Sequence, residues 1–305
     1  WWMVLAGSAA GLALGAGNPA TNKLSADHVT GGHQGAVMGV KQSGPPLGVL
    51  FAGLALPSVA AALGWRWALG LTALIPAAGL LWLLRVVPRE TLHRAERRGT
   101  ATLPPDARAT MWWLTVIGFA VATGVAAVLA FLPLYAQQSV GLSTLQAGLM
   151  AAFVGVTGIT GRILWSWQGG RFDHLATPLA IMGVLSVVGA LLFWAAADWG
   201  PAALWAGALV SGASMMAWHA VAWLALITAV EAAAVGAASG VVHLGSSIGF
   251  GIGPLVFGLI ADHASYGWAW AVVVVLFVAA TSGTLVWRGR VRRAAPARAT
   301  VPVAF

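Results

Sequence analysis

The sequence predicts an all-α membrane protein made of two related halves. The chain has 305 residues, of which 59% are hydrophobic and 8% are charged, whereas soluble domains carry about 25% charged residues. Residues 35–68 recur at 236–269, an offset of 201, with ten of 34 positions identical. Related halves in an apolar chain are typical of transporters with parallel repeats. The identical pairs are Gly35/Gly236, Ala36/Ala237, Gly39/Gly240, Val40/Val241, Gly44/Gly245, Gly48/Gly249, Leu54/Leu255, Ala60/Ala261, Trp67/Trp268 and Ala68/Ala269.

Nine apolar spans can be drawn along the chain, and each is long enough to cross a bilayer as a helix of about 20 residues. They lie at about 1–23, 36–60, 66–86, 111–136, 144–166, 176–197, 201–229, 236–261 and 267–288. A polar, proline-containing connection separates the third span from the fourth. The expected organisation is therefore a first-half membrane part at 1–86, a central loop at 87–110, a six-helix bundle at 111–288, and an Arg-rich tail at 289–305 that is disordered after about Val291.

The repeat offset predicts that the first half is truncated at its N-terminus. The second half begins near Met111, and subtracting the offset of 201 places the matching start about 90 residues before Trp1. Such a stretch holds about three helices. The nine spans are therefore interpreted as nine of an original twelve transmembrane helices.

The positive charges indicate how the chain is oriented. Arg residues cluster in the central loop and the tail, and Lys23, Arg162 and Arg171 flank connections on the same side. Cytoplasmic loops carry the excess of Lys and Arg, so the central loop and the C-terminus are expected in the cytoplasm, with a bacterial inner membrane as the expected location. The net charge of +8 is thereby explained by topology and not by nucleic acid. Cysteine is absent from the chain, which excludes a disulfide or a thiolate metal site.

The repeated stretch carries glycines four residues apart, a spacing that lets membrane helices approach closely. On a helix, the first pair and the second pair point in opposite directions, which predicts packing on two faces. The glycines expected to pack helices are Gly35, Gly39, Gly44, Gly48, Gly236, Gly240, Gly245 and Gly249.

The run from Gly35 to Gly48, rich in glycine and proline, resembles the fifth helix of the major facilitator superfamily, and the run from Gly245 to Gly258 resembles the eleventh. Residues 161–173 resemble the connection between the eighth and ninth helices, although Ser166 stands where the family usually has Gly and Gly170 where it has Asp. Asp173 could replace that acid. Residues 134–148 are similar to the junction of the seventh and eighth helices.

The resemblance implies two six-helix bundles with a substrate cavity between them at mid-membrane, and the present spans would be helices four to twelve. Alternating access would then come from one half rocking against the other. A monomer is expected, with the lipid bilayer and a small-molecule substrate as its partners, and without nucleic acid or a cofactor.

Polar residues inside spans are the candidate substrate-binding residues, because they are costly in lipid. Lys41 is the clearest, with snorkelling to the interface as the alternative. Gln42 and its repeat mate His243 suggest a polar lining, or else hydrogen bonds between helices. Asn18 and His219 form a second repeat pair, and Asn22 continues the face of Asn18. His219 could carry a proton or bind substrate, and a structural role is equally compatible.

Other candidates lie at span ends. Tyr135 and Gln138, with Gln137 between them, would lie at an outer gate or rim, although Tyr is also an ordinary interface anchor. Trp218 is a candidate for the cavity lining. Arg162, Arg171 and Asp173 are expected to form a cytoplasmic gate, with plain topology charges as the alternative.

No enzyme is expected. The sequence Gly245-Ser246-Ser247-Ile248-Gly249 matches the GxSxG pattern of hydrolases, but that motif needs a strand-turn-helix context. The leading hypothesis is a secondary transporter of a small organic solute, preferably an organic anion because of Lys41 and His219. An efflux permease for hydrophobic compounds is the alternative, and a non-transporting protein or inactive fragment on the same scaffold is the second. Symport or antiport, and a proton or another coupling ion, stay open.

Overall fold

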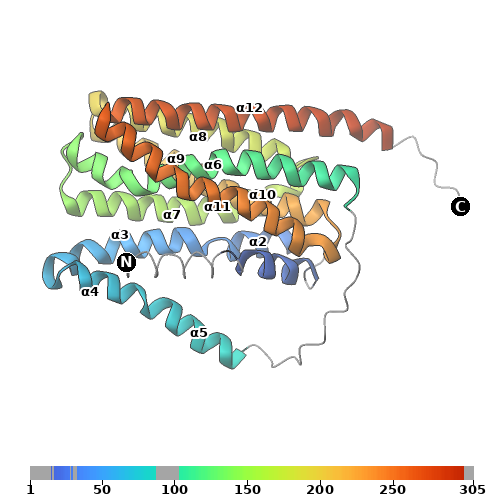
Figure 1. The fold of residues 1–305 in the computed structure, drawn as a ribbon, viewed down its shortest axis with the longest axis horizontal. Coiled ribbons are helices and arrows are strands. Elements are labelled where there is room, and N and C mark those ends of the chain that lie inside the picture. Colours follow the sequence, from blue (N-terminus) through green and yellow to red (C-terminus); the bar gives the residue numbers. More distant parts are fainter. Residues whose placement is uncertain (1–14, 16, 28, 30–32, 87–102, 299–305) are drawn as a thin grey trace, which may run out of the picture.

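The structure is a computed structural model, and it describes residues 15, 17–27, 29, 33–86 and 103–298. All long elements in this part are helices, which run side by side along a common direction (Figure 1). Residues 17–27 are helical, and the further helices are α2 (Gln34–Lys41), α3 (Gly44–Leu63), α4 (Trp65–Thr72), α5 (Leu74–Val86), α6 (Pro105–Gln138), α7 (Thr144–Gln168), α8 (Ala176–Trp199), α9 (Pro201–Ala213), α10 (Met215–Ala229), α11 (Ala232–His263) and α12 (Tyr266–Arg298).

Within the described residues, seven helical stretches are long and apolar enough to cross a membrane. They are Gln34–Leu63, Pro105–Gln138, Thr144–Gln168, Ala176–Trp199, Pro201–Ala229, Ala232–His263 and Tyr266–Arg293. Of the two further expected spans, the one at 1–23 lies mostly outside the described residues. The span expected at 66–86 is divided into α4 and α5, because Pro76 has no N–H to donate to the Thr72 carbonyl. The Ala73 N–H bonds to the Gly70 carbonyl instead, at 3.1 Å.

Two helices extend beyond their expected ends. The first, α6, begins at Pro105, inside the expected central loop, where a proline at the first helical turn is well tolerated. The second, α12, continues to Arg298. The expectation of a disordered tail after Val291 is therefore wrong up to this residue. Alanine and arginine, which both favour helices, make up six of the eight residues 291–298, and the run continues a helix that is already formed, with Pro296 near its end.

Two of the membrane-spanning stretches are broken in the middle. The chain leaves the helical conformation between Lys41 and Gly44, where Pro45 and Pro46 follow at the start of α3 and cannot donate to the preceding carbonyls. The other break lies at Ser214, between α9 and α10, where φ is −115° and ψ is −74°. Discontinuous helices of this kind often form the binding sites of secondary transporters. Both breaks lie against α7.

A seam of glycines brings the first half against α7. A Cβ atom added at Gly39 would lie 3.0 Å from the Arg162 carbonyl oxygen, and one added at Gly53 would lie 2.6 Å from the Ala152 nitrogen. Gly155, on α7, faces Leu50 in the same way, at 2.6 Å from its nitrogen. At these positions the backbones touch, and any side chain would force them apart.

The expected packing on two faces is met on only one face in the described part of the chain. Gly35 and Gly39 pack on α7, but a Cβ at Gly44 or Gly48 would meet nothing within 4 Å. The second copy differs from the first, as Gly245 and Gly249 pack on α6 whereas a Cβ at Gly240 meets nothing within 4 Å. Gly236 has only the Lys23 side chain near it, at 3.7 Å.

Candidate functional site

A chain of polar contacts joins the two halves at the break after α2. Lys41, the last residue of α2, donates from Nζ to the Asn22 side-chain oxygen. Asn22 in turn donates from Nδ2 to Ser239 Oγ on α11, at 3.1 Å. Asn22 and Ser239 are both completely buried, with 0% exposure. The half-buried Lys41 cation is thus bound by a neutral oxygen of Asn22, and Asn22 links it to Ser239 of the second half.

The next residue, Gln42, extends the same network. Its Nε2 donates to the Asn18 side-chain oxygen at 3.3 Å, and the Gln42 side chain is buried. The helix at 17–27 thereby presents Asn18 and Asn22, one turn apart, to the two residues at the end of α2. The structure therefore brings four of the expected binding residues into contact.

Arg162 of α7 joins this network from the other half. It is only 5% exposed, and it donates from Nε to the Met216 carbonyl at 2.6 Å and from Nη1 to the Gln42 carbonyl. The Gln42 carbonyl is available because Pro46, four residues later, has no N–H. No carboxylate lies within 4.0 Å of Arg162 in the described part, where Lys23–Asp27 is the one ion pair. The structure therefore places Arg162 beside the helix break and not on an exposed gate.

The α9/α10 break is closed by a second side chain of α7. Trp165 donates from its indole Nε1 to the Ala213 carbonyl at 3.0 Å. The Ala217 N–H, which would reach this carbonyl in a regular helix, bonds to the Ser214 carbonyl instead, at 3.0 Å. Arg162 and Trp165, three residues apart, thus each satisfy a carbonyl that a helix break exposes.

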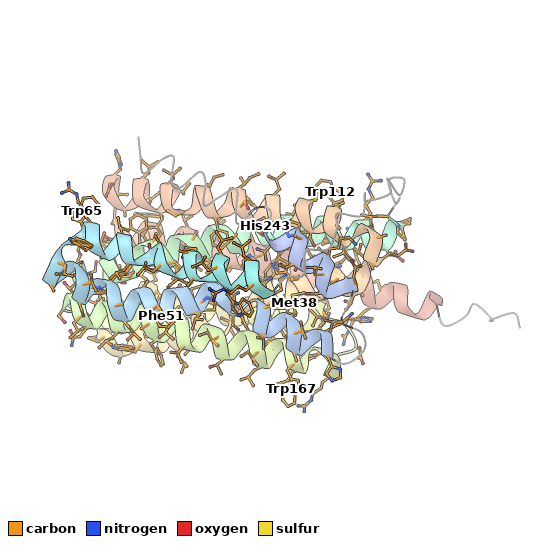
Figure 2. All side chains as sticks on the ribbon, turned by 90° about the horizontal axis from the view of Figure 1, so that it is seen from below. Met38, Phe51, Trp65, Trp112, Trp167 and His243 are labelled. Atoms are coloured by element: carbon orange, nitrogen blue, oxygen red, sulfur yellow. The ribbon has the colours of Figure 1, made fainter. Side chains whose placement is uncertain are left out.

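Aromatic rings surround the two expected histidines. The His219 ring lies 5.3 Å from that of Trp218 and 5.9 Å from that of Phe250. His219 Nε2 is buried without a hydrogen-bond partner in the described structure. His243, labelled in Figure 2, lies 6.1 Å from the ring of Trp223. These residues add aromatic surface and a titratable group next to the cationic network.

Tyr135 and Gln138 are not part of this network. Tyr135 Oη donates to the Phe193 carbonyl at 2.9 Å, and Gln138 accepts from Tyr266 Oη at 2.8 Å. The Tyr135 ring also lies 5.2 Å from that of Trp270. Both residues therefore tie the end of α6 to α8 and α12 within the second half.

Arg171 and Asp173 are both exposed and form no ion pair with each other within the described residues. Arg171 instead lies over the Trp167 ring, 5.1 Å from its centroid. The three expected gate residues are thus separated by the structure, since Arg162 is buried two turns earlier on α7.

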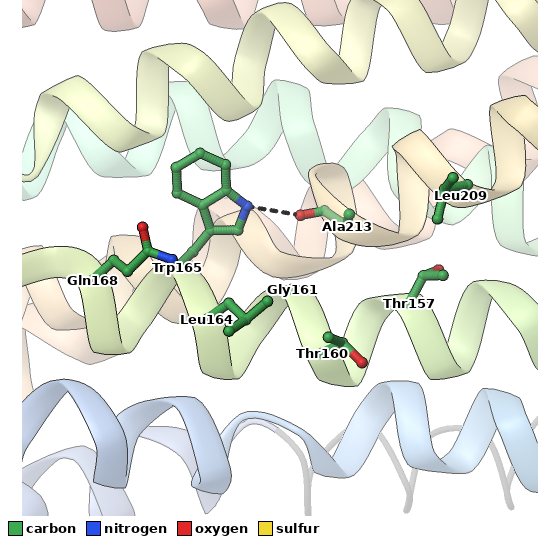
Figure 3. A pocket seen from close by; sticks show the side chains of 8 residues that line it. All are labelled: Thr157, Thr160, Gly161, Leu164, Trp165, Gln168, Leu209 and Ala213. Atoms are coloured by element: carbon green, nitrogen blue, oxygen red, sulfur yellow. Dashed lines mark hydrogen bonds between the residues drawn. The ribbon is translucent and has the colours of Figure 1, made fainter.

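A surface groove of about 340 Å³ lies between α7 and α9. Figure 3 shows Thr160, Leu164 and Gln168 along its α7 side, and Leu209 and Ala213 along its α9 side. The groove does not include the polar network. Among the described residues, no group of three or more His, Asp or Glu side chains could hold a metal ion.

Ser239, Trp165 and the Gln42 main-chain carbonyl are site components that the sequence reasoning missed. Ser239 could have been found from periodicity, because it lies one turn before His243 on the same helix. A main-chain acceptor cannot be recognised from the residue type. Pro45 and Pro46 nevertheless indicate that the carbonyls four residues earlier have no main-chain N–H donor.

The comparisons with known proteins agree with this architecture. Residues 1–230 match the family model described as Major Facilitator Superfamily, which is three quarters of the chain. A comparison with curated proteins returns no match. Together with the seven apolar helical stretches of the described residues, the match shows an integral, multi-pass membrane protein. The chain belongs to the major facilitator superfamily of secondary transporters.

Proposed function

We propose that this transporter moves a small organic anion, which binds between Lys41 and Arg162. The supporting observation is that two cationic side chains lie at the contact between the halves, inside membrane-spanning stretches, with no carboxylate within 4.0 Å in the described structure. Uncompensated charge at membrane depth is expensive and marks functional sites. An anionic substrate would neutralise both cations.

The groups around these cations suit a carboxylate or a similar oxyanion. An ammonium has three donors and a guanidinium has five, whereas the bonds described here use one of Lys41 and two of Arg162. The amides of Asn18, Asn22 and Gln42 add neutral donors. In the alternating-access movement that goes with two such halves, the bond from Arg162 to the Gln42 carbonyl would be exchanged for a bond to substrate.

Proton coupling would use His219 or His243. Both rings face aromatic neighbours, and histidine is a residue type that takes up and releases protons in transporters. Protonation of His219 would add a third positive charge near the anion, which fits symport of an anion with a proton.

Efflux of hydrophobic compounds is the second candidate. Trp218, Trp223 and Phe250 lie within 5.3–6.1 Å, between ring centroids, of the two histidines. Such a surface would bind flat apolar molecules by stacking. This candidate does not use the charge of Lys41, and the two candidates can be separated on that basis.

The test is transport by the protein reconstituted in liposomes, with radiolabelled mono- and dicarboxylates as anions and ethidium as the hydrophobic compound. Lys41→Ala should lower carboxylate uptake by at least about tenfold, because hydrogen bonds to charged groups contribute about 1.5–3 kcal/mol. Lys41→Arg should keep part of the uptake. Lys23→Ala is the matched control, because Lys23 is exposed and paired with Asp27 at 2.8 Å.

Unchanged carboxylate uptake in Lys41→Ala would reject the anion proposal. Ethidium transport that is the same in Lys41→Ala and in the unchanged protein, without carboxylate uptake by either, would favour the efflux candidate instead.

We also propose that the central loop and the C-terminus face the cytoplasm of a bacterial inner membrane, based on the arginine clusters. The chain contains no cysteine, so a single cysteine introduced at Arg290 reports its side of the membrane without background. It should be protected from an impermeant maleimide in intact cells and labelled after lysis.

A further inference from the structure

The groove between α7 and α9 faces the surface of the membrane-spanning bundle. Leu164 and Leu209, on its two sides, are 45% and 50% exposed. The hollow exists because the residues between these edges are small. Gly161 packs directly on the Ala213 backbone, with an added Cβ only 2.7 Å from its carbonyl oxygen. The groove is thus an apolar depression in a surface that contacts lipid.

One end of this groove is polar, and a basic residue follows it in the chain. Gln168, the last residue of α7, closes the α7 side, and the 3-10 turn Gly169–Arg171 that follows carries Arg171 just beyond the lining residues. The Arg171 guanidinium lies over the ring of Trp167, 5.1 Å from its centroid, and Trp167 is 58% exposed. Exposed Trp residues lie at the level of lipid headgroups, and a basic residue there attracts an anionic headgroup. The apolar depression therefore ends where a headgroup would lie.

We propose that this groove binds an anionic phospholipid, with an acyl chain between α7 and α9 and the headgroup phosphate at Arg171 and Gln168. The volume of about 340 Å³ lies at the lower end of the range for small-molecule sites, about 300–1,000 Å³, and holds part of one acyl chain. The lipid would contact Trp165, whose indole closes the α9/α10 break. Bound lipid would thereby hold this break in its closed form.

The experiment is native mass spectrometry of the purified protein after exposure to equal amounts of dioleoyl phosphatidylglycerol and dioleoyl phosphatidylcholine. The unchanged protein should retain phosphatidylglycerol in preference, by about fivefold, the ratio that one cation near an anionic headgroup supports. Ala213→Phe should fill the groove and remove retention of both lipids. Ala206→Phe is its control, because Ala206 is exposed on the same face of α9, two turns away and outside the groove.

The headgroup contact is tested separately. Arg171→Gln should retain lipid but lose the preference for phosphatidylglycerol, whereas Arg292→Gln, an exposed position on α12, should keep it. Equal retention of the two lipids by the unchanged protein would overturn the proposal, as would equal lipid binding by the Ala213→Phe and Ala206→Phe variants. Displacement of the lipid by soluble glycerol phosphate would show a free-anion site instead. A dimer that disappears only in Ala213→Phe would assign the groove to a second copy of the chain.

Discussion

The first copy of the repeat breaks between Lys41 and Gly44, whereas the second copy passes through the matching positions as one continuous helix, α11. Pro45 and Pro46 of the first copy correspond to Ser246 and Ser247 of the second, which keep their N–H groups. The two copies also pack through different glycine pairs. Gly35 and Gly39 contact α7, and Gly245 and Gly249 contact α6. Among the described residues, a Cβ added at Gly44, Gly48 or Gly240 would meet nothing within 4 Å, and one at Gly236 would meet only the Lys23 side chain.

This comparison shows that one inherited glycine pattern supports two different contacts. Within the described residues, each copy packs through the glycine pair that meets its own partner helix. The break in the first copy provides a feature that the second copy lacks. The Gln42 carbonyl, next to Lys41, has no main-chain donor from the following turn and accepts from Arg162 instead. At this point the two copies thus differ by two prolines and one lysine, because the matching position of Lys41 is Val242.

The largest effect is expected from removing the side chain that closes the first break. Arg162→Ala leaves the Gln42 and Met216 carbonyls without this donor, at about 1–3 kcal/mol for each buried acceptor. The melting temperature of the detergent-purified protein should fall clearly, while Arg171→Ala, at an exposed position, should leave it almost unchanged.

A double-mutant cycle attributes this loss to the break itself. Pro46→Ala restores an N–H that can bond to the Gln42 carbonyl, as in the second copy. Arg162→Ala should then cost less in the Pro46→Ala background, by about 1 kcal/mol. Additive effects of the two substitutions would contradict the assigned role of Arg162.

An intermediate effect on stability is expected for glycine substitutions at two repeat pairs, four variants in all. Gly39→Ala and Gly249→Ala should each lower stability by about 1–3 kcal/mol, because the added Cβ would lie 3.0 Å from the Arg162 carbonyl oxygen and 2.9 Å from Thr123 Oγ1, respectively. Their repeat mates, Gly240→Ala and Gly48→Ala, should be neutral or stabilising by up to about 1 kcal/mol, because alanine favours a helix over glycine. Thermal unfolding measures all four. The same loss at both members of a repeat pair would show that the two copies pack alike.

The smallest effect is expected at the second break. Trp165→Phe keeps an aromatic ring but removes the donor to the Ala213 carbonyl, a loss of about 0.5–1.5 kcal/mol. Trp167→Phe is the control, since Trp167 is 58% exposed. Hydrogen exchange of the Ser214–Trp218 amides should increase only in Trp165→Phe. Unchanged exchange would mean that the break holds without the indole.

Much of the fold could be predicted from the sequence, because lipid imposes a simple rule on length and hydrophobicity. Seven of the nine expected spans are found in the described residues, and the family match confirms the superfamily. The break at Ala73 was missed because the apolar run continues through it, and hydropathy does not register the N–H that Pro76 lacks. The extension of α12 to Arg298 does not follow from hydropathy, because the apolar run ends before the arginines begin.

The candidate site could be predicted only in part. Asn18, Asn22, Lys41 and Gln42 stand out as polar residues inside apolar spans, and the structure joins them. Arg162 lies near the end of its span. At such a position the local sequence does not distinguish a buried arginine from one at the membrane surface. Its contact with Gln42 is made across 120 residues, a distance over which no periodic pattern operates. The partners of Tyr135 and Gln138 on α8 and α12 depend on helix packing for the same reason.

The glycine seam between α3 and α7 has a mechanical consequence. Where Gly53 meets Ala152 and Gly155 meets Leu50, no side chain projects from the glycine into a socket on the other helix. At these positions the glycines carry no side chain that would have to change rotamer if α3 were displaced along α7. Interlocked leucines would instead give a series of distinct steps. We therefore expect a movement between the halves to meet little steric resistance at these glycines, and the polar bonds at the Lys41 end of the seam to limit it.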